Sequence, residues 1–160
     1  MKGMQNLILG LLFVFMTISA TAQKADSEIR QTKQPKVFLI GEQPQVFEDL
    51  SISYDKLLLD VCDDDMNKAY GKWVDMLQEM EKHATDINFD IKGVKLWLKV
   101  FWEKDGTIAH IGYHLKPDSK NVKTKYLSAF LKSFSQNYKT RCEAEVRFSQ
   151  YSSASFPTMY

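Results

Sequence analysis

The sequence predicts an α+β domain: a small antiparallel sheet, built as hairpin, helix and last strand, with two or more amphipathic helices packed on one face. Three observations predict it. Alternating segments flank an Asp-Gly pair, three stretches repeat apolar residues at helical spacing, and another alternating segment follows near the C-terminus. The chain is 44 % hydrophobic, which is enough for one core. We therefore expect a single domain over residues 37–160.

The first residues have the three parts of a secretory signal. Lys2 supplies positive charge, residues 7–18 form a short apolar run, and Ala20-Thr21-Ala22 has the small residues of a cleavage site. The run is shorter than the roughly 20 residues of a spanning helix. We expect a signal peptide over residues 1–22, export to a periplasm or secretion, and no membrane insertion after cleavage. An uncleaved anchor is the alternative.

Residues 23–36 are polar and lack periodicity, so they are expected to form a flexible leader. Loss of Lys2 with the signal lowers the count of Lys and Arg from 21 to 20, against 20 Asp and Glu. A neutral chain with interspersed charges lacks the basic stripe of a nucleic-acid-binding protein. The charge balance therefore argues against a nucleic-acid partner.

The N-terminal part of the domain is expected to hold one strand and two helices. Residues 37–40 are a short apolar run that Gly41 stops, which is typical of a strand. Apolar residues then recur at helical spacing over 50–61 and, more strongly, over 63–82. Three aspartates begin the longer helix, where a cap and the helix dipole favour acids. The core stripe of that helix is expected to include Met66, Tyr70, Trp73 and Met80.

The strongest strand signal runs from Val94 to Leu115. Its two halves alternate apolar and polar residues around Asp105-Gly106, the favoured dipeptide of a two-residue hairpin. A turn there places apolar residues opposite one another on a single face, and a shift of one residue would break the match. The expected pairs are Trp102 with Ala109, Val100 with Ile111, Leu98 with Tyr113 and Leu96 with Leu115.

The opposite face of this hairpin pairs aromatic residues with histidines, Phe101 with His110 and Trp97 with His114. The two histidines are four residues apart on a strand, roughly 13 Å, so they cannot share one metal ion. We expect them to be half-exposed neighbours of the aromatic rings. The same face is a candidate surface for an aromatic or peptide partner.

The C-terminal part is expected to add a helix and a strand. Apolar residues recur on one helical face over 122–136. Residues 144–149 alternate, with Glu145 and Arg147 on the polar side, which predicts the last strand. The serine-rich tail that follows is expected either to dock along a sheet edge or to stay mobile.

Residues that could carry chemistry are dispersed. A nucleophile elbow, a glycine-rich phosphate loop and a closely spaced set of zinc ligands are all missing from the sequence. We therefore expect no enzyme activity, no cofactor and no metal. Cys62 and Cys142 can pair as a disulfide in an exported protein, or remain buried thiols, and both alternatives stay open.

Three consecutive segments carry a family resemblance: the turn EKDGTI, the helix KTKYLSAFLKSF and the strand AEVRFSQ. Over residues 94–150 this order resembles the C-terminal domain of the TonB energy-transducer family. The resemblance implies a periplasmic α+β domain whose last strand, here around residues 143–149, lies at a sheet edge and can take a strand from a partner. No Pro-rich spacer follows the cleavable N-terminal segment, so a soluble adaptor is the expected form.

These observations predict an exported, non-catalytic protein-interaction or adaptor module of the bacterial envelope. The alternative is a small-ligand or lipid carrier, with a pocket between the long helix, at Tyr70 and Trp73, and the sheet. The candidate partner-binding residues are Trp97, Phe101, His110, His114, Glu145 and Arg147.

Overall fold

The computed structural model describes residues 34–142 and 144–158. The predicted signal peptide and most of the predicted leader lie outside the described residues, and the unit discussed below begins at Pro35. Its elements in chain order are β1 (Val37–Leu39), α2 (Pro44–Ser53), β2 (Lys56–Leu57), a 3-10 turn (Asp60–Cys62), α3 (Met66–Asp86), β3 (Lys95–Trp102), β4 (Ile108–Leu115), α4 (Thr124–Asn137) and β5 (Phe148–Ser155). The predicted combination of helices with a sheet is confirmed.

The sheet has five strands in the order β1-β4-β3-β5-β2. Its middle pairs are antiparallel, but β1 runs parallel to β4 and β2 runs parallel to β5. The prediction of an antiparallel sheet is therefore wrong at both edges. The reason is physical: strands of three and two residues are too short to show a period, and their direction depends on where the preceding chain packs.

The hairpin of β3 and β4 has nearly the predicted register. The confirmed pairs are Leu96 with Leu115, Leu98 with Tyr113, Val100 with Ile111, Trp97 with His114 and Phe101 with His110. Trp102 pairs with Ile108 instead of Ala109, because the register shifts after Phe101. The turn is also wider than predicted: the Gly106 amide donates to the Glu103 carbonyl at 2.9 Å, and Gly106 takes the left-handed φ of 84° that favours glycine.

The long helix α3 begins at Met66, three residues later than the sequence predicts. Asp65 is its cap, and its carboxylate accepts the amides of Asn67 and Lys68 at 2.9 and 3.1 Å. Met66 and Tyr70, expected in the core, are 66 % and 61 % exposed. Met66 lies in the first turn and Tyr70 at the border of the apolar stripe. The buried stripe consists of Ala69, Trp73, Met76, Leu77, Met80 and Ala84.

The other boundary errors have local causes. α2 starts at Pro44, where proline suits the first helical turn, and it ends before Tyr54, so residues 54–61 are not one helix. The last strand is residues 148–155, not 144–149. Serines supply half of the residues of β5 and give little hydrophobic signal, yet its backbone pairs with the whole length of β3.

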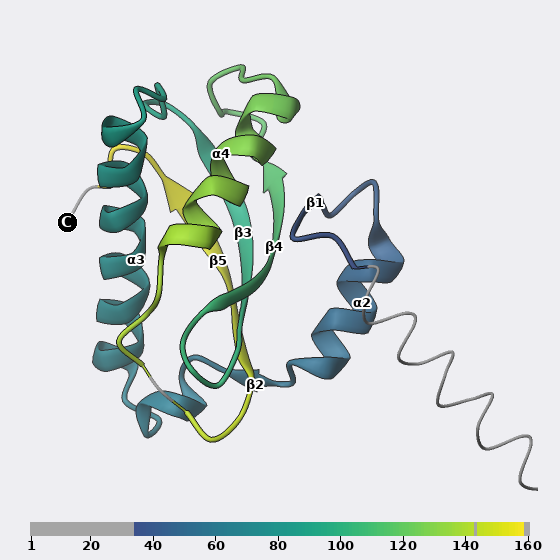
Figure 1. Cartoon of the computed structure of the whole chain (residues 1–160), viewed down its shortest axis with the longest axis vertical. Helices are drawn as coiled ribbons and strands as arrows, with labels where there is room; N and C mark the ends of the chain where they lie inside the picture. The colour runs from purple at the N-terminus through teal and green to yellow at the C-terminus, as the bar shows by residue number, and fades with distance from the viewer. Residues whose placement is uncertain (1–33, 143, 159–160) are drawn as a thin grey trace, which may run out of the picture. The chain divides into compact units, whose positions relative to one another are not determined.

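Helices cover both faces of the sheet, so the prediction that they pack on one face is wrong. The larger core lies between the sheet and the helices α3 and α4, whereas α2 lies on the other side (Figure 1). A smaller core lies under α2 and consists of Phe38, Leu50, Tyr54 and Phe101.

Candidate functional site

The face of the sheet that α2 partly covers is called the outer face below. It carries the predicted aromatic–histidine pairs, because alternate residues of β3 and β4 point to the same side. The residues on this face are Lys95, Trp97, Lys99 and Phe101 of β3, His110, Gly112 and His114 of β4, and Ser149, Tyr151 and Ser153 of β5. One half of the outer face is packed under α2 and the other half is open.

The covered half contains two of the predicted partner-binding residues. The Phe101 side chain is fully buried, and its ring lies 5.3 Å from the Tyr54 ring in an edge-on arrangement. His110 lies 6.4 Å from both rings, and its Nδ1 is 2.9 Å from the Pro35 carbonyl. Burial lowers the pKa of His110. Phe101 and His110 therefore serve packing beneath α2, and a partner cannot reach Phe101 while α2 is docked.

A short polar network closes the rim of this covered half. The Tyr54 hydroxyl donates to Glu103 Oε1 at 2.6 Å, and Arg147 Nε donates to Glu103 Oε2 at 3.0 Å. The Arg147 guanidinium also lies 5.5 Å above the Tyr54 ring. The sequence predicts that Arg147 and Glu145 lie in the last strand, but both precede β5. Arg147 links the end of α2 to the hairpin through Glu103 and Tyr54. Glu145 is exposed.

Replacing Tyr54 by phenylalanine tests this network through pH. Burial, followed by the hydrogen bond to Glu103, raises the pKa of the Tyr54 phenol well above its ordinary value of 10.0. The folded protein therefore holds the phenol proton more tightly than the unfolded chain, and its stability falls as pH rises above 10. At neutral pH we expect the free energy of unfolding of the wild type to exceed that of Tyr54→Phe by about 1–2 kcal/mol. Urea unfolding should show this difference shrinking above pH 10; a constant difference would contradict the network.

The open half presents an aromatic pair to solvent. Trp97 is 41 % and Tyr151 46 % exposed, and their ring centroids are 5.9 Å apart. The Lys116 ammonium lies 4.5 Å over the Trp97 ring, and Phe47 of α2 meets Tyr151 edge-on at 6.1 Å. His114, directly across from Trp97, is exposed. The rings are thus held in place by neighbours while one side of each stays accessible.

Lys99 lies between the two halves and is only 8 % exposed. It pairs across the sheet with Gly112 and Tyr151. Its ammonium is 5.4 Å from the Phe101 ring centroid, and within the described part of the chain it has no hydrogen bond or ion pair. Burial lowers its pKa. A shielded cation without an anion is costly, so this position favours a carboxylate brought by another molecule.

One edge of the open half lacks a neighbouring strand. β2 pairs only with Phe148 and Ser149 of β5. Within the described residues, the stretch of β5 from Gln150 to Ser155 therefore has β3 on one side and no strand on the other. The Trp73 indole donates to the Ser153 carbonyl at 3.4 Å. The expectation of an edge strand at 143–149 is corrected: β5 begins at Phe148, its first two residues lie between β3 and β2, and only its later residues lack a second neighbouring strand.

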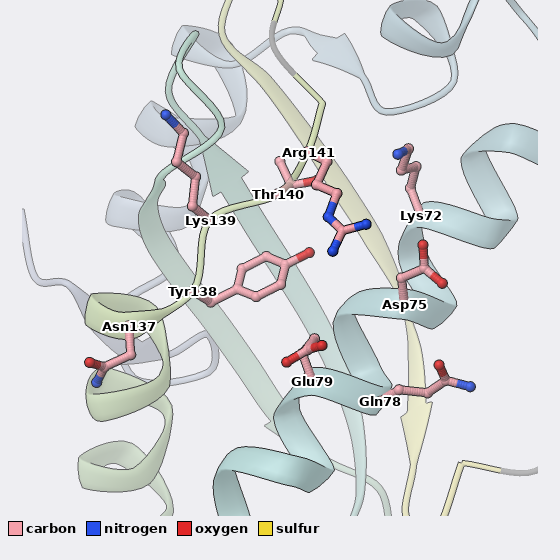
Figure 2. Close-up of a pocket in the computed structure, with 9 residues that line it drawn as sticks. All are labelled: Lys72, Asp75, Gln78, Glu79, Asn137, Tyr138, Lys139, Thr140 and Arg141. Carbon is pink, nitrogen blue, oxygen red and sulfur yellow. The ribbon is translucent and has the colours of Figure 1, made fainter.

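A polar cleft lies between α3 and the segment that follows α4 (Figure 2). Its volume is about 390 Å³, and the Tyr138 ring and the Arg141 guanidinium point across it toward α3. Burial raises the pKa of Tyr138. Sequence reasoning missed this cleft, because its two walls, residues 72–79 and 137–141, are far apart in the chain and share no spacing. The cleft is lined by Lys72, Asp75, Gln78, Glu79, Asn137, Tyr138, Lys139, Thr140 and Arg141.

The pocket predicted between Tyr70, Trp73 and the sheet is occupied by the core. Trp73 is 5 % exposed and packs among the residues between α3 and the sheet. Tyr70 points outward, and neither residue lines the cleft of Figure 2. A ligand site on α3 would therefore use its polar side.

Comparison with protein-family models, with curated proteins and with solved structures finds no match. The resemblance to the TonB family stays a prediction. Within residues 34–142 and 144–158, no helix is long and apolar enough to cross a membrane. The same residues contain no group of three or more His, Cys, Asp or Glu side chains placed to hold a metal ion.

Proposed function

We propose that the protein is an exported, non-catalytic interaction module that binds an acidic protein segment bearing an aromatic or aliphatic side chain. The observation that carries the proposal is the exposed Trp97–Tyr151 pair beside the unpaired, shielded Lys99. Buried aromatic anchors supply most of the energy of protein interfaces. The secretory pattern of the N-terminus and the TonB-like order of elements support an envelope location.

Charge complementarity selects the acidic partner. On the open half, Lys95 is paired with Asp118 at 2.6 Å and Lys116 lies over the Trp97 ring, while Lys99 has no anionic partner among residues 34–142 and 144–158. A partner carboxylate at Lys99 would offset the cost of its burial, and like charges would be repelled. The open stretch of β5 borders the same surface, so an extended segment can pair with its backbone and lay alternate side chains over Tyr151.

Selection of peptides from a displayed random library tests this proposal without knowledge of the natural partner. The immobilised domain, residues 35–160, should enrich peptides in which Asp or Glu lies close to an aromatic or aliphatic residue. Trp97→Ala should weaken their binding at least about tenfold. Lys99→Met nearly keeps the length of the side chain but removes its charge, and it should weaken the binding of acidic peptides by a similar factor.

Tyr126→Ala is the matched control. Tyr126 is an exposed aromatic residue, 56 % accessible, on α4 and so on the other side of the sheet. Its replacement should leave binding unchanged. Peptides that bind Trp97→Ala as well as the wild type would overturn the choice of surface, and enriched peptides without acidic residues would overturn the choice of partner.

Export is tested in cells. The full chain, carrying a C-terminal tag, should be recovered from the envelope or medium with Gln23 as its first residue. Recovery with Met1 intact from the cytosol would contradict the exported location.

A second candidate function is the binding of a small polar ligand in the cleft of Figure 2. The observation that favours it is the polar lining of this cavity, where Arg141 and the Tyr138 hydroxyl face the carboxylates of Asp75 and Glu79, with Lys72 at the rim. A ligand bound there would raise the melting temperature of the native state. A screen of small carboxylates and phosphates should then give shifts that Arg141→Ala removes and Trp97→Ala leaves unchanged.

A further inference from the structure

The two cysteines of the chain meet although they are 80 positions apart. Cys62 ends the 3-10 turn before α3, and Cys142 lies in the connection from α4 to β5. Cys142 Sγ donates to the carbonyl oxygen of Val61, the residue before Cys62, at 3.9 Å, which places Cys142 beside the 3-10 turn that ends at Cys62. Both are free, and they are 5 % and 8 % exposed.

A cavity of about 420 Å³ is lined by both cysteines. It shares Lys72, Asp75 and Arg141 with the cleft of Figure 2, so the thiols lie at one end of a continuous polar surface. Burial, followed by the neighbouring thiol, raises the pKa of Cys62, while Lys72 acts in the opposite direction. The raised pKa favours the protonated form of the Cys62 thiol, and both cysteines line a cavity that a reagent can enter.

We propose that Cys62 and Cys142 are a redox modification site, a dithiol that an oxidant of the disulfide class converts reversibly into an intramolecular disulfide. The oxidant is either a small-molecule disulfide or the disulfide of a thiol–disulfide oxidoreductase. Three observations carry this proposal: the hydrogen bond from Cys142 to the residue before Cys62, the separation of the two cysteines in the chain, and the cavity that both line.

The reaction proceeds by two thiol–disulfide exchanges. One cysteine loses its proton and attacks the oxidant, which forms a mixed disulfide, breaks the oxidant's sulfur–sulfur bond and releases one of its sulfurs as a thiol. The second cysteine then attacks the mixed disulfide, forms the bond between Cys62 and Cys142, and releases the other sulfur. The protein loses two electrons and two protons, and the oxidant gains both.

The bond would tie together both walls of the cleft. Cys142 directly follows Arg141 and Thr140, and the Thr140 amide donates to the Gly106 carbonyl of the hairpin turn at 3.0 Å. Oxidation therefore joins the start of α3 to the segment that carries Tyr138 and Arg141. It also closes a loop of about 80 residues, which restricts the unfolded chain strongly.

The test compares the reduced protein with protein treated with oxidised glutathione. Intact mass should fall by two hydrogen atoms, and a non-reducing digest should contain the Cys62 and Cys142 peptides joined. The melting temperature should rise by on the order of 10 °C. Dithiothreitol should reverse both changes.

Cys62→Ala and Cys142→Ala are the control variants. Each can form only a glutathione adduct or remain unmodified, and neither should show the rise in melting temperature. Glutathione adducts on both cysteines of the wild type, disulfide-linked dimers, or an unchanged mass would each overturn the proposal. The comparison of wild type in two redox states needs no variant, so it remains decisive if a variant fails to fold.

Discussion

Replacing Gly106 by alanine is expected to destabilise the domain by about 2–4 kcal/mol. Gly106 has φ of 84°, a conformation that strains any residue with a Cβ. The added Cβ would also lie 2.6 Å from the Thr140 carbonyl oxygen and 3.1 Å from the Cys142 carbonyl oxygen. Both neighbours are backbone atoms, so relief requires movement of the whole segment that follows α4.

Gly41→Ala is the matched control for this substitution. No atom lies within 4 Å of a Cβ built at Gly41, and its φ is not in the left-handed region. Gly41→Ala should change the free energy of unfolding by no more than about 0.5 kcal/mol. Urea unfolding of the two variants measures the difference. Equal stability of Gly106→Ala and the wild type would show that the hairpin turn is not held against residues 140–142.

Alanine replacement of two aromatic residues on one strand is expected to give opposite results. Phe101 and Trp97 point to the same side of β3, but Phe101 is buried under α2 and Trp97 is 41 % exposed. Phe101→Ala leaves a cavity in the small core and should lower the free energy of unfolding by about 3–5 kcal/mol. Trp97→Ala removes exposed surface and should cost about 1 kcal/mol or less.

The peptide-binding assay separates these variants further. Trp97→Ala should lose binding while its denaturant midpoint stays close to that of the wild type. Phe101→Ala should lose stability first, and it should lose binding only because α2 no longer supports the outer face. If Trp97→Ala unfolds the domain, the open half belongs to the core and the proposed surface fails.

The hairpin shows how far a local pattern can predict structure. Alternation with a period of two places one set of side chains toward the core, and a slip of one residue would expose it. Three of the four predicted apolar pairs are therefore present. The pattern cannot show the bulge at Ala109, because one extra residue changes the pairing without changing the composition of either face.

The candidate site is a mixed case. Trp97 and His114 are exposed as predicted, whereas Phe101, on the same face, is buried by α2. Alternation specifies which residues share a face, but it carries no information about what later covers that face. Alternation likewise could not predict that Lys99 lacks an acidic neighbour, because this depends on which residues of β4 and β5 lie beside it.

Local periodicity was sufficient to predict α3, α4 and the paired strands β3 and β4, because each buries a stripe or face that repeats along its own residues. Tertiary packing was required for the parallel edge strands, the position of β5, the contact between Cys62 and Cys142 and the cleft at Tyr138. These features join segments far apart in the chain. Their energy comes from long-range contacts, and such contacts leave no period in the sequence.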